Sequence, residues 1–179
     1  MDGLSKMRLL NTIAGDIIGS KYEFNNIHTK DFELFQDDMY YTDDTVLTIA
    51  TVDALIEINK RYTEESYDFI EDIEEKLINI FKEKYYTYGN KYNDSKLLYG
   101  SNFLKWLSNT YEKAYPYNSF GNGSAMRVSP IAWYSKSIKE VRILAKCSAS
   151  VTHNHPYGIK GAVDIAESIF KLLNYYESR

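Results

Sequence analysis

Apolar residues recur along this chain mostly at spacings of three and four positions. That spacing puts apolar side chains on one face of an α-helix, whereas a half-buried strand alternates apolar and polar residues. No stretch of the sequence shows sustained strict alternation. Helices are therefore predicted around six apolar sets: Leu10, Ile13, Ala14, Ile17 and Ile18; Leu47, Thr51, Ala54, Leu55 and Ile58; Ile70, Ile73, Leu77, Ile78 and Phe81; Phe103, Trp106 and Leu107; Val141, Leu144 and Ala145; and Ile159, Val163, Ala166, Ile169, Phe170 and Leu173.

Polar residues and one proline mark where several of these helices begin. Ser101 opens the fourth helix, and Ser137 with Glu140 forms a capping box before the fifth. Pro156 suits the first position of the last helix, where no backbone N–H is needed. Residues 87–99 are polar and contain Gly and Asn, which predicts a connection. Because no heptad persists, the predicted fold class is all-α, a compact orthogonal bundle rather than a coiled coil.

Length, cysteine count and charge exclude several classes of protein. A chain of 179 residues corresponds to one domain, which we predict to span residues 1–179. No apolar run is long enough to cross a bilayer and no secretory signal is evident, so a cytoplasmic protein without a membrane partner is expected. Cys147 is the only cysteine, which excludes an internal disulfide and a Cys-based zinc site. The net charge is −4 and no basic stripe exists, so nucleic-acid binding is disfavoured.

A first polar cluster lies at the end of the first predicted helix. Gly15 and Gly19 are four positions apart, a spacing that would let another element approach the helix backbone closely. Asp16 lies among apolar neighbours and needs a partner. Glu23 follows the helix at its carbonyl end, where the helix dipole disfavours a carboxylate. Glu23 is therefore interpreted either as a functional acid or as an exposed charge.

A second cluster, Thr42, Asp43, Asp44 and Thr45, directly precedes the second predicted helix. An N-cap explains one or two of these residues, because Thr and Asp side chains accept hydrogen bonds from free backbone N–H groups. It does not require all four together. Carboxylates and hydroxyls are also the hard oxygen ligands that magnesium or calcium takes. Because consecutive side chains point in different directions, Asp43 and Asp44 could serve two ions.

A third cluster is the Gly, Ser and Asn loop at residues 118–124, which leads to Arg127. Such loops present free N–H groups before a helix and suit a phosphate, although a plain turn has the same composition. Arg127 is predicted to be a structural tether inside the following helix. His153 and His155 are two positions apart, which is not the spacing of a helical zinc site. One is expected to adjoin a helix start and the other to contact a ligand.

Taken in order, these clusters resemble the motifs of the ADP-ribosylglycohydrolase family, which includes dinitrogenase reductase-activating glycohydrolase and the serine-ADP-ribose hydrolases. The resemblance rests on residues 15–23, 41–45, 121–127 and 152–153. The first motif is closer to the serine branch, although Asn118 stands where that branch commonly has glycine. The resemblance implies an all-α fold and a hydrolase that removes ADP-ribose from modified protein side chains, or a related acceptor, with one or two magnesium ions (Mg²⁺).

The resemblance also implies roles for residues of this chain. Glu23 and Asp44 would be catalytic, and Thr42, Asp43 and Asp44 would be ligands of magnesium. The loop would wrap the diphosphate, with Phe120 near the terminal ribose. The implied substrate-binding set is Asn118, Ser119, Phe120, Gly121, Asn122, Gly123 and His153.

One family motif has no counterpart in this sequence. The family carries an Asp-x-Asp-Thr segment near its C-terminal end that supplies the other metal ligands, and this sequence reaches Arg179 without one. We therefore expect the C-terminal third of the family domain to be absent. Two hypotheses follow. In the first, the chain is a magnesium-dependent hydrolase of ADP-ribosylated protein or a related acceptor, to which a second chain could supply the missing ligands. In the second, it is a catalytically weak or dead ADP-ribose-binding module on the same fold.

Overall fold

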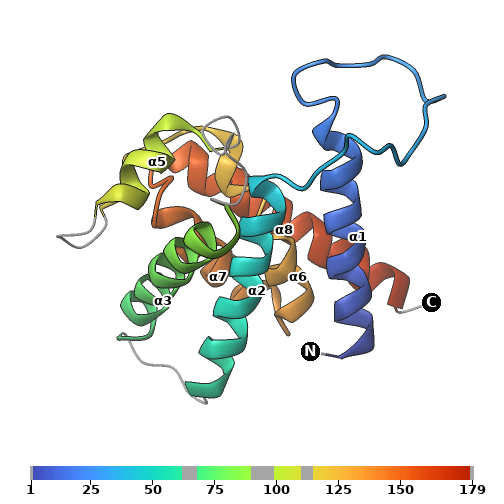
Figure 1. Cartoon of the computed structure of the whole chain (residues 1–179). Helices are drawn as coiled ribbons and strands as arrows, with labels where there is room; N and C mark the ends of the chain where they lie inside the picture. The colour runs from blue at the N-terminus through green and yellow to red at the C-terminus, as the bar shows by residue number, and fades with distance from the viewer. Residues whose placement is uncertain (1, 62–67, 90–98, 110–114, 178–179) are drawn as a thin grey trace.

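The computed structural model describes residues 2–61, 68–89, 99–109 and 115–177, and every regular element within these ranges is helical. The all-α prediction is confirmed, and so are the six predicted helices (Figure 1). A connection was predicted at residues 87–99. Residues 87–89 belong instead to a π-helical turn, and residues 90–98 lie outside the described ranges. The elements are α1 (Gly3–Ser20), α2 (Asp43–Arg61), α3 (Asp68–Lys84), the π-helical turn η1 (Tyr85–Gly89), α5 (Ser101–Ser108), the 3₁₀ turn η2 (Asn122–Ser124), α6 (Ser129–Tyr134), α7 (Ile138–Ser150) and α8 (Pro156–Glu177).

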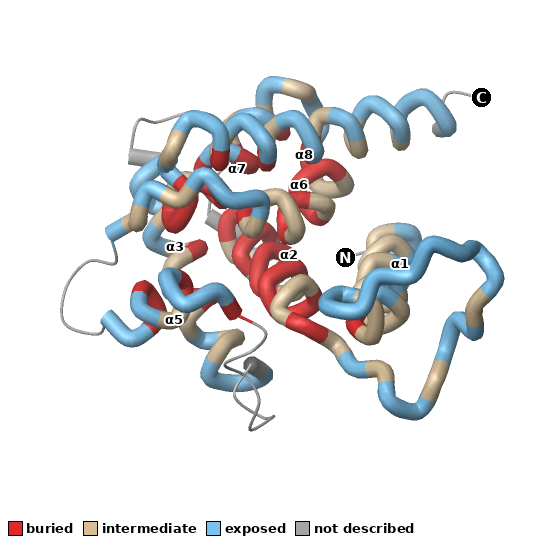
Figure 2. Tube along the Cα trace, turned by 90° about the horizontal axis from the view of Figure 1, so that it is seen from above, coloured by how far each residue is buried: buried red, intermediate tan, exposed pale blue. Residues whose placement is uncertain are grey.

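Helix α2 is the central element of the core. It contacts α1, α3 and α6, and Figure 2 shows it buried along much of its length. Ala50 and Ala54 are completely buried there, and their small side chains suit an interior helix. The buried hydroxyl of Thr51 donates a hydrogen bond to the carbonyl oxygen of Leu47 at 2.9 Å, so this polar group is buried without the loss of a hydrogen bond.

Helices α7 and α8 form the largest helix–helix contact of the described structure. The N–H of Glu140 donates to Ser137 Oγ at 3.2 Å, which confirms the predicted cap at the start of α7. The carboxylate of Glu140 accepts from the N–H of Lys136 rather than from that of Ser137. Pro156 is the first residue of α8, as predicted, and Cys147 is a buried residue of α7. None of the described helices combines the length and hydropathy that a membrane span requires.

Helix α1 is the least covered of the long helices. Its predicted apolar face includes Leu10, yet 65% of Leu10 is exposed, and Ser20 is the one described α1 residue that is buried. A Cβ atom added at Gly15 or Gly19 would meet nothing within 4 Å. The predicted close approach of another element at these two glycines is therefore wrong for the described residues. Amphipathic spacing identified the helix correctly, but it does not reveal whether its apolar face is covered.

Candidate functional site

The carboxylate of Asp16 joins α1 to the start of α2. Its Oδ2 atom accepts hydrogen bonds from the N–H groups of Thr42, at 2.8 Å, and Thr45, at 3.2 Å. The hydroxyl groups of the same two threonines donate to Asp16 at 2.6 and 2.5 Å. The N–H of Asp44 also donates to Thr42 Oγ1 at 3.2 Å. The second cluster therefore does cap α2, and Asp16 has the partner that its apolar surroundings demanded.

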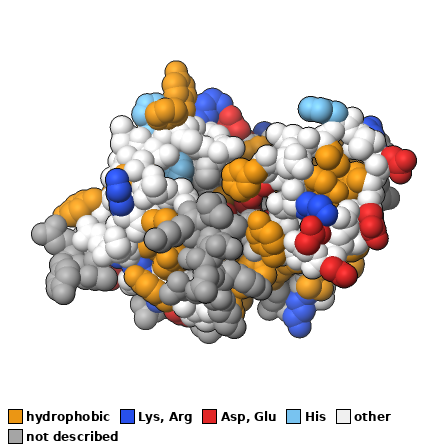
Figure 3. Space-filling view, turned by 45° about the horizontal axis from the view of Figure 1, so that its top comes forward, with side chains coloured by type: hydrophobic (Ala, Val, Ile, Leu, Met, Phe, Trp, Pro, Cys, Tyr) orange, Lys and Arg blue, Asp and Glu red, His pale blue; other side chains and the backbone are white. Residues whose placement is uncertain are grey.

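Three further carboxylates crowd around this cap. Burial, together with the negative charges of Asp44, Glu23 and Asp16, raises the pKa of Asp43 to about 7. Burial and Asp16 raise the pKa of Asp44, and burial, Asp44 and Asp16 raise that of Glu23. Glu23 is an exposed residue. Figure 3 shows acidic side chains recessed between hydrophobic ones near the middle of one face of the molecule.

The oxygen atoms of these side chains are of the kind that magnesium takes. Magnesium takes hard oxygen ligands in near-octahedral geometry. Within the described ranges, no group of three or more Asp, Glu, His or Cys side chains is arranged to hold a metal ion. The ligand roles of Thr42, Asp43 and Asp44, and the catalytic roles of Glu23 and Asp44, stay predictions.

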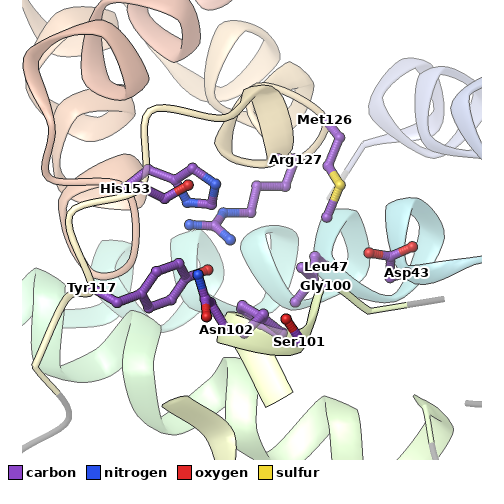
Figure 4. Close-up of a pocket in the computed structure, with 12 residues that line it drawn as sticks. Asp43, Leu47, Gly100, Ser101, Asn102, Tyr117, Met126, Arg127 and His153 are labelled. Carbon is purple, nitrogen blue, oxygen red and sulfur yellow. The ribbon is translucent and has the colours of Figure 1, made fainter. Parts of the chain in front are cut away.

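A pocket of about 280 Å³ connects Asp43 of α2 to the Gly, Ser and Asn loop and to the segment before α8. Among the predicted site residues, Asp43, Ser119, Gly123 and His153 line it (Figure 4). The other lining residues are Leu47, Gly100, Ser101, Asn102, Phe103, Tyr117, Met126 and Arg127. The remaining predicted residues do not line it: Glu23, Thr42, Asp44, Asn118, Phe120, Gly121 and Asn122.

The loop is folded by local hydrogen bonds. Asn118 adopts a left-handed conformation (φ 52°), which asparagine tolerates better than most residues and which glycine also adopts. Its N–H donates to Asn154 Oδ1 at 2.8 Å, and the N–H of Gly121 donates to Ser119 Oγ at 3.2 Å. Phe120 lies on the surface, with 74% of the residue exposed and its ring 5.8 Å from that of His155.

The expectation that the loop runs directly into a helix needs correction. It leads into the three-residue turn η2, and α6 begins only at Ser129. Arg127 therefore precedes α6 instead of lying inside it. Its predicted role as a tether is supported, because its Nη2 donates to the carbonyl oxygen of Ser148 at 2.5 Å and to Thr152 Oγ1 at 2.9 Å.

Helix α8 is packed tightly against the loop at Gly158. A Cβ atom there would lie 2.6 Å from the carbonyl oxygen of Ser119 and 3.0 Å from the Cβ atom of His153. Ser124 Oγ donates to the carbonyl oxygen of Gly158 at 3.0 Å, which ties η2 to the same turn of α8. The sequence did not reveal the role of Gly158. The one signal that it offered was the position of this glycine in the first turn of the helix that begins at Pro156.

The two histidines have different surroundings. His155 adjoins the start of α8, where its Nδ1 accepts from the N–H of Tyr157 at 3.2 Å. His153 is buried, and its Nδ1 lies 2.8 Å from Thr152 Oγ1. Burial and the positive charge of Arg127 lower the pKa of His153 to about 4. His153 is therefore a neutral hydrogen-bonding group in the wall of the pocket at physiological pH.

The sequence model of the ADP-ribosylglycohydrolase family matches residues 7–178. The chain belongs to the ADP-ribosylglycohydrolase family. Its similar relatives include ADP-ribosylhydrolase ARH3 of Mus musculus and of Homo sapiens, each 27% identical, and that of Xenopus tropicalis, 28% identical. These matches cover 87–90% of this chain but 45–48% of the relatives. The chain thus spans about half the length of the curated relatives it matches.

We expect Gly158→Ala to destabilise the protein, because the new methyl group would collide with the backbone of Ser119 and with His153. A backbone oxygen cannot move aside without shifting the loop. Gly161→Ala is the matched control, because it lies in the same helix in open space and should raise the melting temperature through the better helix propensity of alanine. Thermal unfolding of both variants measures this. If the two substitutions behaved alike, α8 would not be packed against the loop as described.

We expect Asp43→Asn to stabilise the protein at pH 8 in the presence of EDTA. The pKa of Asp43 rises from 3.8 to about 7 on folding, so folding takes up a proton between these values and stability falls as the pH rises through them. The variant has no charge to bury, and its melting temperature should exceed the wild-type value by about 2–4 °C at pH 8. At pH 4 the difference should shrink, which serves as the internal control. A wild-type protein at least as stable as the variant at pH 8 would contradict the burial of this charge.

Proposed function

We propose that this chain binds ADP-ribose, free or attached to protein, in the pocket between α2, the loop and the start of α8, and that it acts in the magnesium-dependent hydrolysis of the ADP-ribosyl bond. The observation that carries the proposal is that Asp43, Ser119, Gly123 and His153 line one pocket, although Asp43 lies more than 70 residues before the other three in sequence. The family membership and the names of the ARH3 relatives support the same substrate class.

The two sides of the pocket suit the two ends of ADP-ribose. The loop and the neutral His153 offer hydrogen-bond donors without a carboxylate, which favours the diphosphate. The opposite side carries Asp43. The negative charges of Asp44 and Glu23 contribute to the raised pKa of Asp43, and that of Asp44 contributes to the raised pKa of Glu23. Hydrolysis at the anomeric carbon passes through an oxocarbenium-like state, which negative charge stabilises, and a carboxylate of raised pKa is a suitable base near neutral pH.

Magnesium, when bound, would hold ribose hydroxyls and acidify a water. Thr42, Asp43 and Asp44 are the residues of this chain that would contribute ligands. The hydroxyl of Thr42 donates its hydrogen to Asp16 at 2.6 Å, so its oxygen retains a lone pair in a fixed orientation. The remaining positions would be filled by water, by ADP-ribose or by a second chain.

The ligand count favours one alternative. Within the described ranges no group of three or more Asp, Glu, His or Cys side chains is arranged to hold a metal ion, so a chain that binds ADP-ribose but hydrolyses it weakly or not at all also fits this pocket. The hydrolase and the binding module would both bind ADP-ribose, and only the hydrolase would turn it over. Binding and turnover are therefore tested separately.

Binding should depend on Gly123. A Cβ atom at this position would lie 3.2 Å from Nε2 of His153, so the branched side chain of Gly123→Val would fill the pocket beside the histidine. We expect calorimetry with ADP-ribose to show at least a tenfold loss of affinity, with about 1.4 kcal/mol of binding energy corresponding to each factor of ten. Gly161→Val, in open space on α8, is the control and should bind as wild type does. Unchanged affinity in Gly123→Val would remove the loop from the site.

Turnover should be slow for the chain alone. We expect little release of ADP-ribose from modified protein in millimolar magnesium, because the described side chains leave most of an octahedral site to other ligands. Addition of a polypeptide corresponding to the remaining half of an ARH3 relative should raise the rate, and Asp43→Ala should abolish that gain. Rapid turnover by the chain alone, lost in Asp43→Ala, would show that this chain completes the metal site itself.

A further inference from the structure

Arg127, Thr152 and His153 form a buried chain of hydrogen bonds behind the pocket. Arg127 and Thr152 are completely buried, and His153 is 7% exposed. Arg127 Nη2 donates to Thr152 Oγ1 at 2.9 Å, and Thr152 Oγ1 lies 2.8 Å from Nδ1 of His153. The guanidinium group also lies over the ring of Phe81, 4.5 Å from its centroid, so the cation is held on two sides.

The donors and acceptors of this chain define which nitrogen of His153 carries the proton. A guanidinium group can only donate, so Thr152 Oγ1 must accept from Arg127. The one hydroxyl hydrogen of Thr152 can then reach Nδ1 of His153 at 2.8 Å or the carbonyl oxygen of Ala149 at 3.5 Å. The hydroxyl of Tyr117 is a further hydrogen-bond partner of Thr152, and unlike the carbonyl oxygen it can donate its own hydrogen to Oγ1. The shorter contact is the better hydrogen bond. Nδ1 is then the acceptor, and a neutral imidazole has its hydrogen on Nε2.

We propose that Arg127 and Thr152 are positioning residues that hold His153 in the tautomer protonated at Nε2 and so present a fixed N–H donor beside Gly123. Nε2 is the His153 atom next to Gly123, 3.2 Å from where a Cβ atom of that residue would lie, and both residues line the pocket. Figure 4 shows the imidazole ring beside the guanidinium group of Arg127 at one side of the pocket.

Backbone hydrogen bonds hold the histidine in this position before any ligand binds. The N–H groups of Thr152 and His153 donate to the carbonyl oxygen of Ala149 at 3.1 and 2.7 Å, and the carbonyl oxygen of Thr152 accepts from the N–H of Tyr117 at 3.3 Å. A donor fixed in this way loses little conformational freedom on binding. The ligand group that it fits is an acceptor oxygen without a hydrogen, such as a phosphate oxygen of ADP-ribose; only this identification rests on the proposed function.

The tautomer can be observed directly in the free chain. Nitrogen-15 NMR of the His153 imidazole at pH 7 should show a protonated Nε2 and an unprotonated Nδ1. In Thr152→Val, which removes the hydroxyl at almost constant volume, we expect a mixture of tautomers. The affinity for ADP-ribose, measured by calorimetry, should then fall roughly fivefold, the effect of impairing one hydrogen bond. Thr152→Ser keeps the hydroxyl and should restore both the wild-type spectrum and the affinity.

Thr51→Val is the matched control, because Thr51 is equally buried but donates to Leu47 within α2, away from this chain of hydrogen bonds. It should leave the spectrum of His153 and the affinity unchanged. The inference would be overturned if the His153 imidazole of the wild-type protein were protonated at Nδ1, or if that of Thr152→Val gave the wild-type spectrum. The wild-type spectrum alone tests the tautomer even if the variant does not fold. If the predicted tautomer is observed and ADP-ribose does not bind, the inference holds and the proposed function is wrong.

Discussion

The hydrogen bonds of Asp16 determine how the rest of the site is built. One carboxylate from α1 accepts from the backbone and the hydroxyls of Thr42 and Thr45, and so satisfies the exposed N–H groups at the start of α2. Because α2 is the central helix, this contact also ties α1 to the core at its C-terminal end. It brings Asp16 close to Asp43 and Asp44. Burial and the repulsion between these carboxylates raise the pKa of Asp43 and of Asp44. The carboxylates therefore repel one another at the start of α2, and a bound cation would reduce this repulsion.

The opposite wall of the pocket depends on a second, neutral set of contacts. Gly158 lets α8 approach the carbonyl oxygen of Ser119, and Ser124 donates to the carbonyl oxygen of Gly158. Arg127 is the one charge in this wall among the pocket-lining residues that the structure describes, and the carbonyl oxygen of Ser148, the hydroxyl of Thr152 and the ring of Phe81 surround it. Burial of His153, together with this nearby cation, lowers the pKa of the imidazole. The wall therefore presents donors without presenting an exposed charge.

The helices were predictable from local patterns, and the contacts between them were not. Periodicity and capping residues identified α1, α2, α3, α5, α7 and α8, because those signals act over three or four positions. The six residues of α6 are too few for a period to show. Leu10 is exposed and Gly15 faces open space because of what lies opposite α1. A local sequence pattern carries no information on which element lies opposite a helix.

The same distinction applies to the site. Residue types indicated Asp43 and the loop that contains Ser119 and Gly123, and the family resemblance indicated His153; the structure brings these residues into one pocket. Gly158 and Arg127 escaped a functional interpretation because their roles come from partners far away in sequence.

The two walls together set a direction for a bound ADP-ribose under the proposed function. A diphosphate carries negative charge, and it would be repelled by the crowded carboxylates around Asp43. It would be accepted by the loop and by the Nε2–H group of His153, since Asp43 on the opposite side is the one carboxylate among the described residues that line the pocket. The terminal ribose would then lie toward Asp43, where developing positive charge at the anomeric carbon is favoured. The charge asymmetry of the pocket, more than any single contact, would align the substrate with the acids.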